Sequence, residues 1–274
     1  MMQTVLVGDF KVSRLGFGAM RVLGSPDVWG PPKDPANARK VLRRAYELGA
    51  NFFDTAESYG PQTDETAIAE AMHPYPKDLV IGTKCGLLRP KPGRWDPDGR
   101  PEKLRKDLAG SLKRLRLDCL HLWQLHAPDP KVPFEESVGV LADAQREGKV
   151  RHVGLSNVTL RQLEQARRIV PIVSVQNRYN IGDRHPEDVL KACEKLGIAF
   201  LPWYPLGDGA ALKNRKVKQV AKKLEATPAQ IALAWLLAKS PVMLPIPGTS
   251  SIAHLEENMG ARSVRLSDED MAAL

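Results

Sequence analysis

The fold of this chain is decided by a stretch in which an apolar segment runs into a polar turn, Asn51-Phe52-Phe53-Asp54-Thr55-Ala56-Glu57-Ser58-Tyr59-Gly60. Its first four residues follow Gly49 and are few enough for a buried strand. Asp54 then stands at the carboxyl end of that strand, and Tyr59 lies on the loop beyond it. In a barrel of parallel strands, this is the end where catalytic residues gather. The stretch alone also fits a capping aspartate and an ordinary loop tyrosine, so the rest of the chain must decide between them.

Strand-like and helix-like segments alternate along the rest of the chain. A short N-terminal β-hairpin is expected from Thr4–Val7 and Phe10–Val12. Eight strands are expected at 14–20, 51–54, 79–84, 119–125, 150–155, 172–175, 198–203 and 242–246. Helical periodicity covers 36–48, 64–72, 101–115, 133–147, 159–169, 186–196, 213–224, 228–239 and 251–259. This alternation predicts an α/β fold, a closed (β/α)8 TIM barrel that forms a single domain over residues 1–274.

The composition bounds the class of protein. Hydrophobic residues make up 43% of the 274 residues, enough for a sizeable core. No apolar run reaches membrane-spanning length, and no basic-then-apolar leader opens the chain. Three scattered cysteines argue against a disulfide framework, and the absence of ligand pairs at metal-binding spacing argues against a metal site. We therefore expect a cytoplasmic protein with no bound metal and no membrane partner.

The net charge of +8 favours an anionic partner, such as nucleic acid, an anionic surface or a phosphorylated cofactor. The basic residues are spread over several helix-like segments, which is typical of solvated helix faces. No aromatic residues alternate with them as a site for single-stranded nucleic acid requires. We therefore expect no nucleic-acid partner.

Polar or aromatic residues directly follow most of the predicted strands. They are Asp54 with Tyr59, Lys84, His126, Ser156 with Asn157, Gln176, Trp203, and the turn Gly248-Thr249-Ser250-Ser251. A lysine at the end of an apolar strand is costly to bury without a carboxylate partner, and Asp54 is the nearest candidate. The others also have simpler interpretations: His126 and Trp203 as core residues, Ser156 and Asn157 as caps of the next helix. The 248–251 turn reads equally as a helix N-cap, and such a cap is also an anion site.

Together these residues resemble the aldo-keto reductase family, and most of all its short bacterial members. The resemblance covers nearly the whole chain, through local matches at 15–18, 53–60, 82–84, 124–126, 154–157, 175–177, 204–207, 246–250 and 257–258. It implies an NAD(P)H-dependent oxidoreductase that reduces the carbonyl group of a small aldehyde or ketone to an alcohol. The implied catalytic set is Asp54, Tyr59, Lys84 and His126.

General chemistry supports these implied roles. Tyr59 would be the proton donor to the carbonyl oxygen, and a nearby ammonium is expected to lower the pKa of this phenol. Asp54 would hold Lys84 charged and in place. His126 would donate a hydrogen bond to the carbonyl oxygen and orient the substrate.

The resemblance also implies where a nicotinamide cofactor lies across the barrel mouth. Its carboxamide would be held by Ser156, Asn157 and Gln176, and its ring would stack on Trp203. Its phosphates would meet Leu206, Gly207 and the turn of Gly248, Thr249, Ser250 and Ser251. Further contacts are expected from Gly18, Met20, His254, Glu257 and Asn258.

Some positions depart from the family pattern. Gly248 and His254 stand where many members carry Lys and Arg for the 2′-phosphate, so NADP is expected as the cofactor by a reduced margin, with NAD possible. His121 stands where relatives often have an acid, and strand alternation should point it away from His126. The residues after Ser267 are too few for the long substrate loop of some relatives, so we expect an open pocket. The Val22–Trp29 and Leu87–Arg100 loops are expected to shape it.

Two other functions fit part of the pattern. A barrel lyase would form a Schiff base through Lys84, but it has no need for Tyr59, Trp203 or the 248–251 turn. A non-catalytic, cofactor-sensing binding subunit would keep the same fold. The presence of all four catalytic residue types argues against this second alternative.

Overall fold

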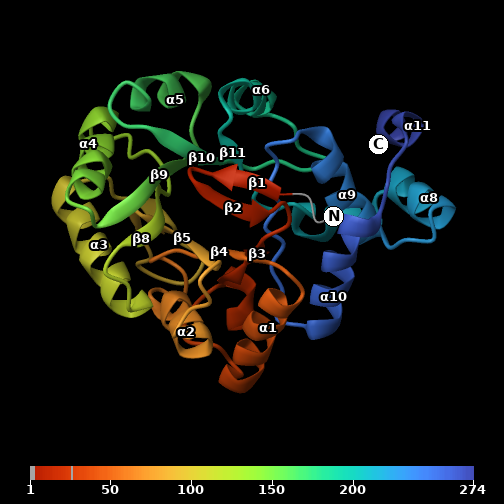
Figure 1. The fold of residues 1–274 in the computed structure, drawn as a ribbon, viewed down its shortest axis with the longest axis horizontal. Helices are drawn as coiled ribbons and strands as arrows, with labels where there is room; N and C mark the ends of the chain where they lie inside the picture. Colours follow the sequence, from red (N-terminus) through yellow and green to blue (C-terminus); the bar gives the residue numbers. More distant parts are fainter. Residues whose placement is uncertain (1–3, 26) are drawn as a thin grey trace.

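The computed structural model describes residues 4–25 and 27–274, and in them seven parallel strands form one curled sheet in the order β11-β10-β9-β8-β5-β4-β3. The helices form an outer ring around these strands (Figure 1). This arrangement confirms the predicted α/β barrel. The strands are β3 (Phe17–Gly18), β4 (Phe52–Asp54), β5 (Val80–Cys85), β8 (Leu120–Leu125), β9 (Val150–Ser156), β10 (Ile172–Gln176) and β11 (Ala199–Phe200).

The segment 242–247 closes the barrel between β11 and β3. On the β11 side, the N–H of Phe200 donates to the carbonyl of Val242 at 2.9 Å, and the N–H of Leu244 donates to the carbonyl of Phe200 at 2.8 Å. The ring of backbone hydrogen bonds therefore continues past β11, where the regular sheet ends.

On the β3 side, the backbone hydrogen bonds run from N–H groups of residues 16–18 to carbonyls of the segment 242–247. The N–H groups of Gly16 and Gly18 donate to the carbonyls of Pro245 and Pro247, at 3.0 and 3.2 Å. Neither proline can donate in return because proline has no backbone N–H. The prediction of a regular strand at 242–246 is therefore wrong in detail, since the segment pairs with its neighbours but forms only an isolated bridge.

Most helices begin where the sequence places a cap or a proline. α3 and α9 each start on a proline, and threonine side chains with a glutamine three residues on form capping boxes at α5 and α9. The helices are α1 (Pro35–Glu47), α2 (Thr63–Met72), α3 (Pro101–Leu115), α4 (Phe134–Arg146), α5 (Leu160–Ala166), α6 (Glu187–Leu196), α7 (Ala210–Lys213), α8 (Arg215–Lys223), α9 (Pro228–Lys239), α10 (Ile252–Gly260) and α11 (Asp268–Ala273), with shorter 3-10 turns η1 (Ala19–Leu23), η2 (Gly207–Gly209) and η3 (Ala261–Ser263).

The helix expected at 213–224 is broken near its start. Asn214 has an extended backbone, and its side-chain oxygen accepts from the N–H groups of Lys216 and Val217. That hydrogen bonding makes Asn214 an N-cap, so α7 ends there and α8 begins. α11 was not expected from the sequence; it starts with a capping box formed by Ser267 and Asp270.

The predicted N-terminal hairpin is present as β1 (Thr4–Val7) and β2 (Phe10–Ser13), and it lies over the centre of the ring of strands (Figure 1). The N–H of Ser13 donates to the side chain of Asn51, the residue just before β4, so the hairpin covers the amino ends of the strands. His121 lies at this end, where its Nδ1 accepts from the N–H of Ile81 at 3.1 Å. The expectation that His121 points away from His126 is confirmed, and the opposite end of the barrel is left open.

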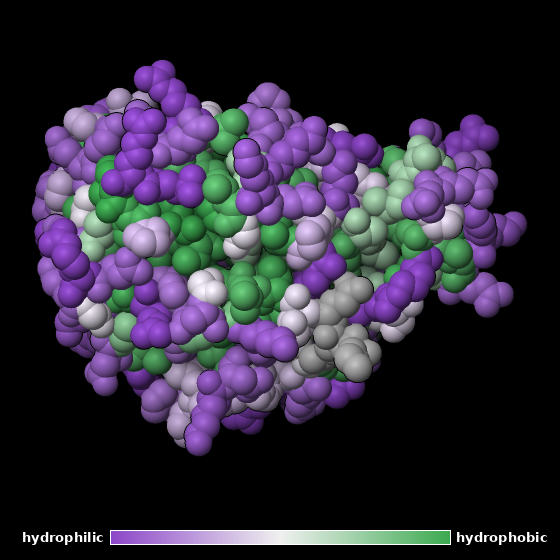
Figure 2. Space-filling view, turned by 45° about the horizontal axis from the view of Figure 1, so that its top comes forward, coloured by the Kyte–Doolittle hydropathy of each residue, from purple (hydrophilic) through white to green (hydrophobic). Residues whose placement is uncertain are grey.

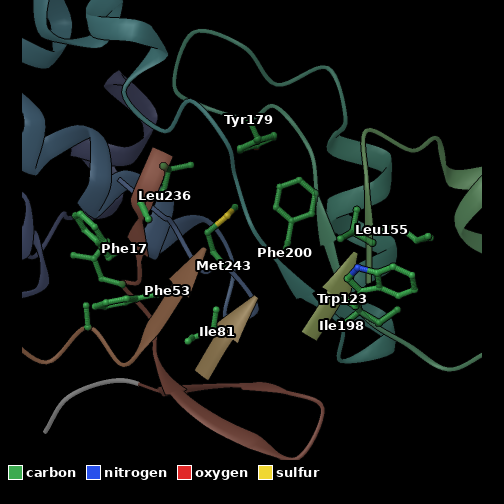
Figure 3. Close-up of a cluster of buried hydrophobic side chains, with 14 of the residues drawn as sticks. Phe17, Phe53, Ile81, Trp123, Leu155, Tyr179, Ile198, Phe200, Leu236 and Met243 are labelled. Carbon is green, nitrogen blue, oxygen red and sulfur yellow. The ribbon is translucent and has the colours of Figure 1, made fainter. Parts of the chain in front are cut away.

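The core has two main parts. Inside the barrel, Val7 and Val12 of the hairpin pack with inward-facing strand residues such as Phe52 and Leu122. Between the sheet and the helices lies a larger cluster, part of which Figure 3 shows, including Phe17 and Phe53 with ring centroids 5.6 Å apart. On the face shown in Figure 2, hydrophilic residues cover much of the surface, with hydrophobic ones between them.

Candidate active site

The four predicted catalytic residues meet at the carboxyl ends of adjacent strands. Asp54 ends β4, Lys84 lies in β5, His126 follows β8, and Tyr59 lies in the turn after β4. Because β4, β5 and β8 are parallel neighbours, their carboxyl ends lie together at the same end of the barrel. Lys84 Nζ lies 2.7 Å from Asp54 Oδ2 and donates to the Tyr59 hydroxyl at 3.2 Å.

Lys84 is held as a charged group. Its side chain is 0% exposed, and its ammonium also donates to the carbonyl of Thr55 at 2.8 Å. Burial by itself lowers the pKa of Lys84, but the adjacent Asp54 and Tyr59 outweigh it and raise the pKa above its usual value. The expected pairing of Lys84 with Asp54 is therefore present, and an ammonium stands beside the phenol.

Tyr59 differs from expectation in its acidity. Burial raises the pKa of Tyr59 to about 12, and the nearby Lys84 offsets only part of that increase. The expectation that the ammonium would bring the net pKa of Tyr59 down is wrong, because desolvation of the phenolate outweighs the ion pair. Tyr59 therefore stays a neutral phenol through the neutral pH range, ready to donate its proton.

His126 faces the same space as a neutral ring. Burial, together with the positive charges of Lys84 and Arg89, lowers the pKa of His126 well below its usual value. Its Nδ1 lies 3.3 Å from Ser58 Oγ, and its ring stands edge-on to Tyr59 at a centroid distance of 5.7 Å. A Ser58 hydroxyl that donates to Nδ1 leaves the ring proton on Nε2, where it can donate to a ligand.

A cavity of ≈ 890 Å³ extends from Tyr59 and His126 across the mouth of the barrel. Many of the predicted cofactor residues line it: Gly18, Met20, Ser156, Asn157, Gln176, Trp203, Leu206, Gly248, Thr249 and Ser250. Gly207 opens η2, directly after Leu206. Ser251, His254, Glu257 and Asn258 lie at the start of α10 or along it, so their contact with a cofactor stays a prediction.

The middle of the cavity wall is a hydrogen-bonded chain of side chains. Asn157 donates to the carbonyl of His126 at 2.9 Å and to Ser156 Oγ at 3.2 Å, and its Oδ1 accepts from Trp203 Nε1 at 3.0 Å. Gln176 donates to Asp54 Oδ1 at 2.7 Å. These contacts fix Ser156, Asn157 and Gln176 around the position expected for the carboxamide, and Gln176 links that position to the predicted catalytic residue Asp54.

At the far end of the cavity, two glycines, Gly18 and Gly248, bring backbone segments into close contact. A Cβ added to Gly248 would lie 2.3 Å from the carbonyl oxygen of Gly18, and one added to Gly18 would lie 2.6 Å from that of Ile246. Ser251 caps the following helix by accepting from the N–H of His254, and Thr249 accepts from the N–H of Ser251. Close backbone, hydroxyl groups and a helix N-terminus together fit the phosphates of a dinucleotide.

Three features of the site were not predicted from the sequence. Arg21 Nη2 lies 2.9 Å from Asp208 Oδ1, and both residues line the cavity, although 187 positions separate them and no local pattern links them. A small hairpin, β6 (Leu87–Leu88) and β7 (Asp96–Pro97), brings Trp95 to the substrate end within a loop predicted only to shape the pocket. The third feature is a buried carboxyl close to the predicted catalytic residues.

That carboxyl is Asp64, in the first turn of α2. Thr55 Oγ1 donates to Asp64 Oδ2 at 2.7 Å, and within the described part of the chain Oδ1 has no hydrogen-bond partner. Burial raises the pKa of Asp64 to about 7. Its neighbour Glu65, in contrast, is paired with Arg114 at 2.7 Å. In the sequence, both acids resemble ordinary first-turn residues of a helix, which hides the difference.

Within residues 4–25 and 27–274, no group of three or more His, Cys, Asp or Glu side chains is placed to hold a metal ion. In the same residues, no helix combines the length and the apolar character needed to cross a membrane.

Known proteins resemble this chain in both fold and sequence. A family model described as the aldo/keto reductase family matches residues 14–274. An uncharacterized oxidoreductase of Schizosaccharomyces pombe is 49% identical over 272 residues, 99% of this chain and 88% of the relative. Pyridoxine 4-dehydrogenase of Escherichia coli is 45% identical over 278 residues, 99% of this chain and 96% of the relative. The crystal structure of a thermostable aldo-keto reductase with the inhibitor epalrestat matches with a TM-score of 0.85 and 32% identity, covering 99% of this chain and 98% of the other. The chain therefore belongs to the aldo-keto reductase family, whose members reduce aldehydes and ketones with a nicotinamide cofactor.

Proposed function

We propose that this chain reduces aldehydes with a preference for NADP(H) and that Tyr59 is the proton donor. One observation carries the proposal: a buried ammonium, Lys84 Nζ, touches both the carboxylate of Asp54 and the hydroxyl of Tyr59, and these two residues line the cavity. A charged lysine fixed on a phenol is suited to stabilise the phenolate that forms when the phenol gives up its proton.

The chemistry follows from the protonation states of these groups. When bound, the reduced nicotinamide supplies a hydride to the carbonyl carbon. Tyr59 transfers its proton to the carbonyl oxygen, so the substrate gains a hydride and a proton and becomes an alcohol. Lys84 stabilises the phenolate that remains until a proton from solvent restores the phenol. His126 donates Nε2–H to the carbonyl oxygen and orients it.

We assign the cofactor contacts by the same reasoning. Ser156 and Gln176 would hold the carboxamide, with Asn157 fixing their surroundings. Trp203 would stack on the nicotinamide ring. Backbone N–H groups at the start of α10, with Thr249, Ser250 and Ser251, would hold phosphate. His254, in the first turn of that helix, is the basic side chain we assign to the 2′-phosphate.

Pyridoxal is the substrate that we propose to test first. The relative from Escherichia coli that is 45% identical is called a pyridoxine 4-dehydrogenase. The substrate end of the cavity here is lined by Leu87, Trp95 and Pro97, which present an apolar and aromatic surface to a flat ring. We also place the protein in the cytoplasm, because Cys85, Cys119 and Cys193 are free thiols.

The experiment is a screen of NADPH and NADH oxidation with pyridoxal and a panel of aldehydes and ketones, for wild type and Tyr59→Phe. General acid catalysis typically contributes about 10²–10⁴-fold, so Tyr59→Phe should lose at least 100-fold in turnover. Its affinity for NADPH, from fluorescence titration, should stay within about twofold. Tyr46→Phe is the matched control, because Tyr46 bonds Asp78 on the surface. Near-normal turnover by Tyr59→Phe would show that another group supplies the proton.

A further inference from the structure

Arg89, directly after β6, is buried although it is charged. It is 8% exposed, and its guanidinium donates to four backbone carbonyls. These acceptors are Asp27 at 2.8 Å, Arg94 at 3.1 Å, Val28 at 3.2 Å and Ser58 at 3.3 Å. Three separate segments are thus held by one side chain: the loop before Trp29, the turn that carries Tyr59, and the β6–β7 hairpin.

The same guanidinium is stacked on an indole. Its central carbon lies 3.5 Å from the ring centroid of Trp95 and 5.5 Å from that of Trp29. A guanidinium prefers such stacking because it is planar and weakly hydrated. One side of Trp95 is therefore covered by Arg89.

The remaining surface of Trp95 borders the cavity. Its ring lies 6.1 Å from that of Tyr59 and 6.4 Å from that of His126, centroid to centroid, and both are T-shaped contacts. Trp95 is 36% exposed, so a ligand can reach it. The indole therefore borders the part of the cavity next to Tyr59 and His126.

Arg89 itself is not available to anchor an anionic substrate. An arginine has five N–H donors, and four are occupied by the carbonyls of Asp27, Val28, Ser58 and Arg94. Its flat face is turned to Trp95. What the site offers to a substrate at this end is the indole.

We propose that Arg89 is a positioning residue that fixes Trp95 as a flat wall beside Tyr59 and His126, and that this wall makes the site favour planar ring aldehydes over aliphatic ones. The inference rests on the proposed function, since it concerns the substrate of the same site. Planar rings gain from contact with a fixed indole because both aromatic stacking and T-shaped packing are favourable. A mobile Trp95 would lose part of this favourable binding free energy, because the indole would have to be ordered each time a substrate binds.

The test compares benzaldehyde with butanal, with NADPH saturating, for wild type, Trp95→Leu, Arg89→Met and the double variant. The measured quantity is the ratio of the two KM values, butanal over benzaldehyde. Trp95→Leu should reduce this ratio roughly three- to tenfold, the range that an aromatic contact provides. Arg89→Met should also lower the KM ratio. The double variant should have a KM ratio no lower than that of Trp95→Leu, because Arg89 acts through Trp95.

Two further variants separate positioning from folding. Arg94→Ala removes an exposed ion pair with Asp96 in the same hairpin and should leave the ratio unchanged. Arg89→Lys keeps the charge but loses the planar fork, so it should lower the ratio as Arg89→Met does, and it provides the test where Arg89→Met does not fold. Thermal unfolding of each variant establishes that it is folded.

The outcomes are distinct. A wild-type enzyme that reduces neither aldehyde contradicts the proposed function. A wild-type enzyme that reduces both, with a KM ratio that Trp95→Leu leaves unchanged, overturns the inference alone. Arg89 variants that lose kcat equally for both aldehydes with an unchanged KM ratio show that Arg89 only supports the fold.

Discussion

Gln176 donates a hydrogen bond of 2.7 Å to Asp54 Oδ1, although 122 positions separate the two residues. Lys84 donates to the other oxygen of the same carboxylate, also at 2.7 Å. Asp54 is therefore held from β10 and from β5 at once. Gln176, expected from the sequence only as a cofactor residue, also holds the carboxylate of the predicted catalytic residue Asp54.

Asp54→Asn should destabilise the protein, because it leaves the buried ammonium of Lys84 without an anion. Breaking one partner of a buried pair typically costs about 3–5 kcal/mol in the free energy of unfolding. Urea unfolding of wild type and variant measures this difference. Asp96→Asn, which breaks the more exposed pair with Arg94, should cost less than about 1 kcal/mol. Equal stability of Asp54→Asn and wild type would mean that the Lys84 ammonium is solvated in solution.

The two directions of the reaction should respond differently to pH. With Tyr59 as the proposed proton donor, reduction needs the protonated phenol, and a pKa of about 12 keeps Tyr59 protonated from pH 6 to 9. Oxidation of an alcohol needs the phenolate, whose population rises about tenfold per pH unit below the pKa. Measuring kcat for both directions over this range should therefore give a nearly flat curve for reduction and a rising one for oxidation. A reduction rate that falls with a midpoint near pH 7 to 8 would contradict the assigned state of Tyr59.

Asp64→Asn should stabilise the protein at neutral and alkaline pH. Because burial raises the pKa of Asp64 from the ordinary 3.8 to about 7, the stability that the neutral acid provides is present below about pH 4. It is lost as pH rises through about 7. One pKa unit corresponds to about 1.4 kcal/mol, so a rise of about three units makes the full effect on the order of 4 kcal/mol.

Urea unfolding of wild type and Asp64→Asn at pH 5 and pH 8 tests this expectation. The free energy of unfolding of Asp64→Asn should exceed that of wild type by more at pH 8 than at pH 5, because an amide does not ionise. Asp118→Asn, at an exposed position, should show no such difference. A wild type that loses no stability relative to Asp64→Asn between these two pH values would show that Asp64 is ionised throughout.

Trp203→Ala should weaken cofactor binding more than it slows the chemical step. Stacking on an aromatic face contributes about 1–1.5 kcal/mol beyond area burial, or roughly a five- to tenfold increase in the dissociation constant of NADPH. Trp203→Phe keeps a ring but loses the hydrogen bond from Nε1 to Asn157, so it should retain much of the affinity. Fluorescence titration with NADPH measures both. Unchanged affinity in Trp203→Ala would remove Trp203 from the cofactor site.

NADPH should bind more tightly than NADH, by a modest factor. The N-terminus of α10 contributes roughly 0.3–1 kcal/mol toward an exposed anion, equivalent to about two- to fivefold. His254→Ala should lower the ratio of the NADH to the NADPH dissociation constant, whereas His185→Ala, at an exposed position in the loop before α6, should not. A clear preference for NADH in wild type would overturn the NADP assignment.

Local chemistry made much of this fold predictable. Prolines and capping threonines predicted where α3 and α9 begin, and apolar runs that end in polar residues located β4, β5 and β8. The same logic predicted that Lys84 would need Asp54. That residues 1–274 form one domain stays a prediction.

Other features depend on contacts between distant parts of the chain, which local patterns do not contain. The segment 242–246 looked like a strand because it is apolar, but Pro245 and Pro247 prevent regular pairing. The raised pKa of Tyr59 depends on how completely the fold buries the phenol. The pair of Arg21 and Asp208 depends on the two 3-10 turns η1 and η2 meeting beside the cavity.

The close contact between Gly18 and Gly248 limits how this protein can change its cofactor. The residue that departs from the Lys of many relatives, Gly248, is also a point where the barrel is joined, with 2.3 Å between its would-be Cβ and the Gly18 carbonyl. A side chain introduced there to attract a 2′-phosphate would push apart the two segments that close the ring. We therefore expect substitutions that add a 2′-phosphate contact to be tolerated better from Thr249 onward than at Gly248, since Thr249 and Ser250 already carry side chains that line the cavity.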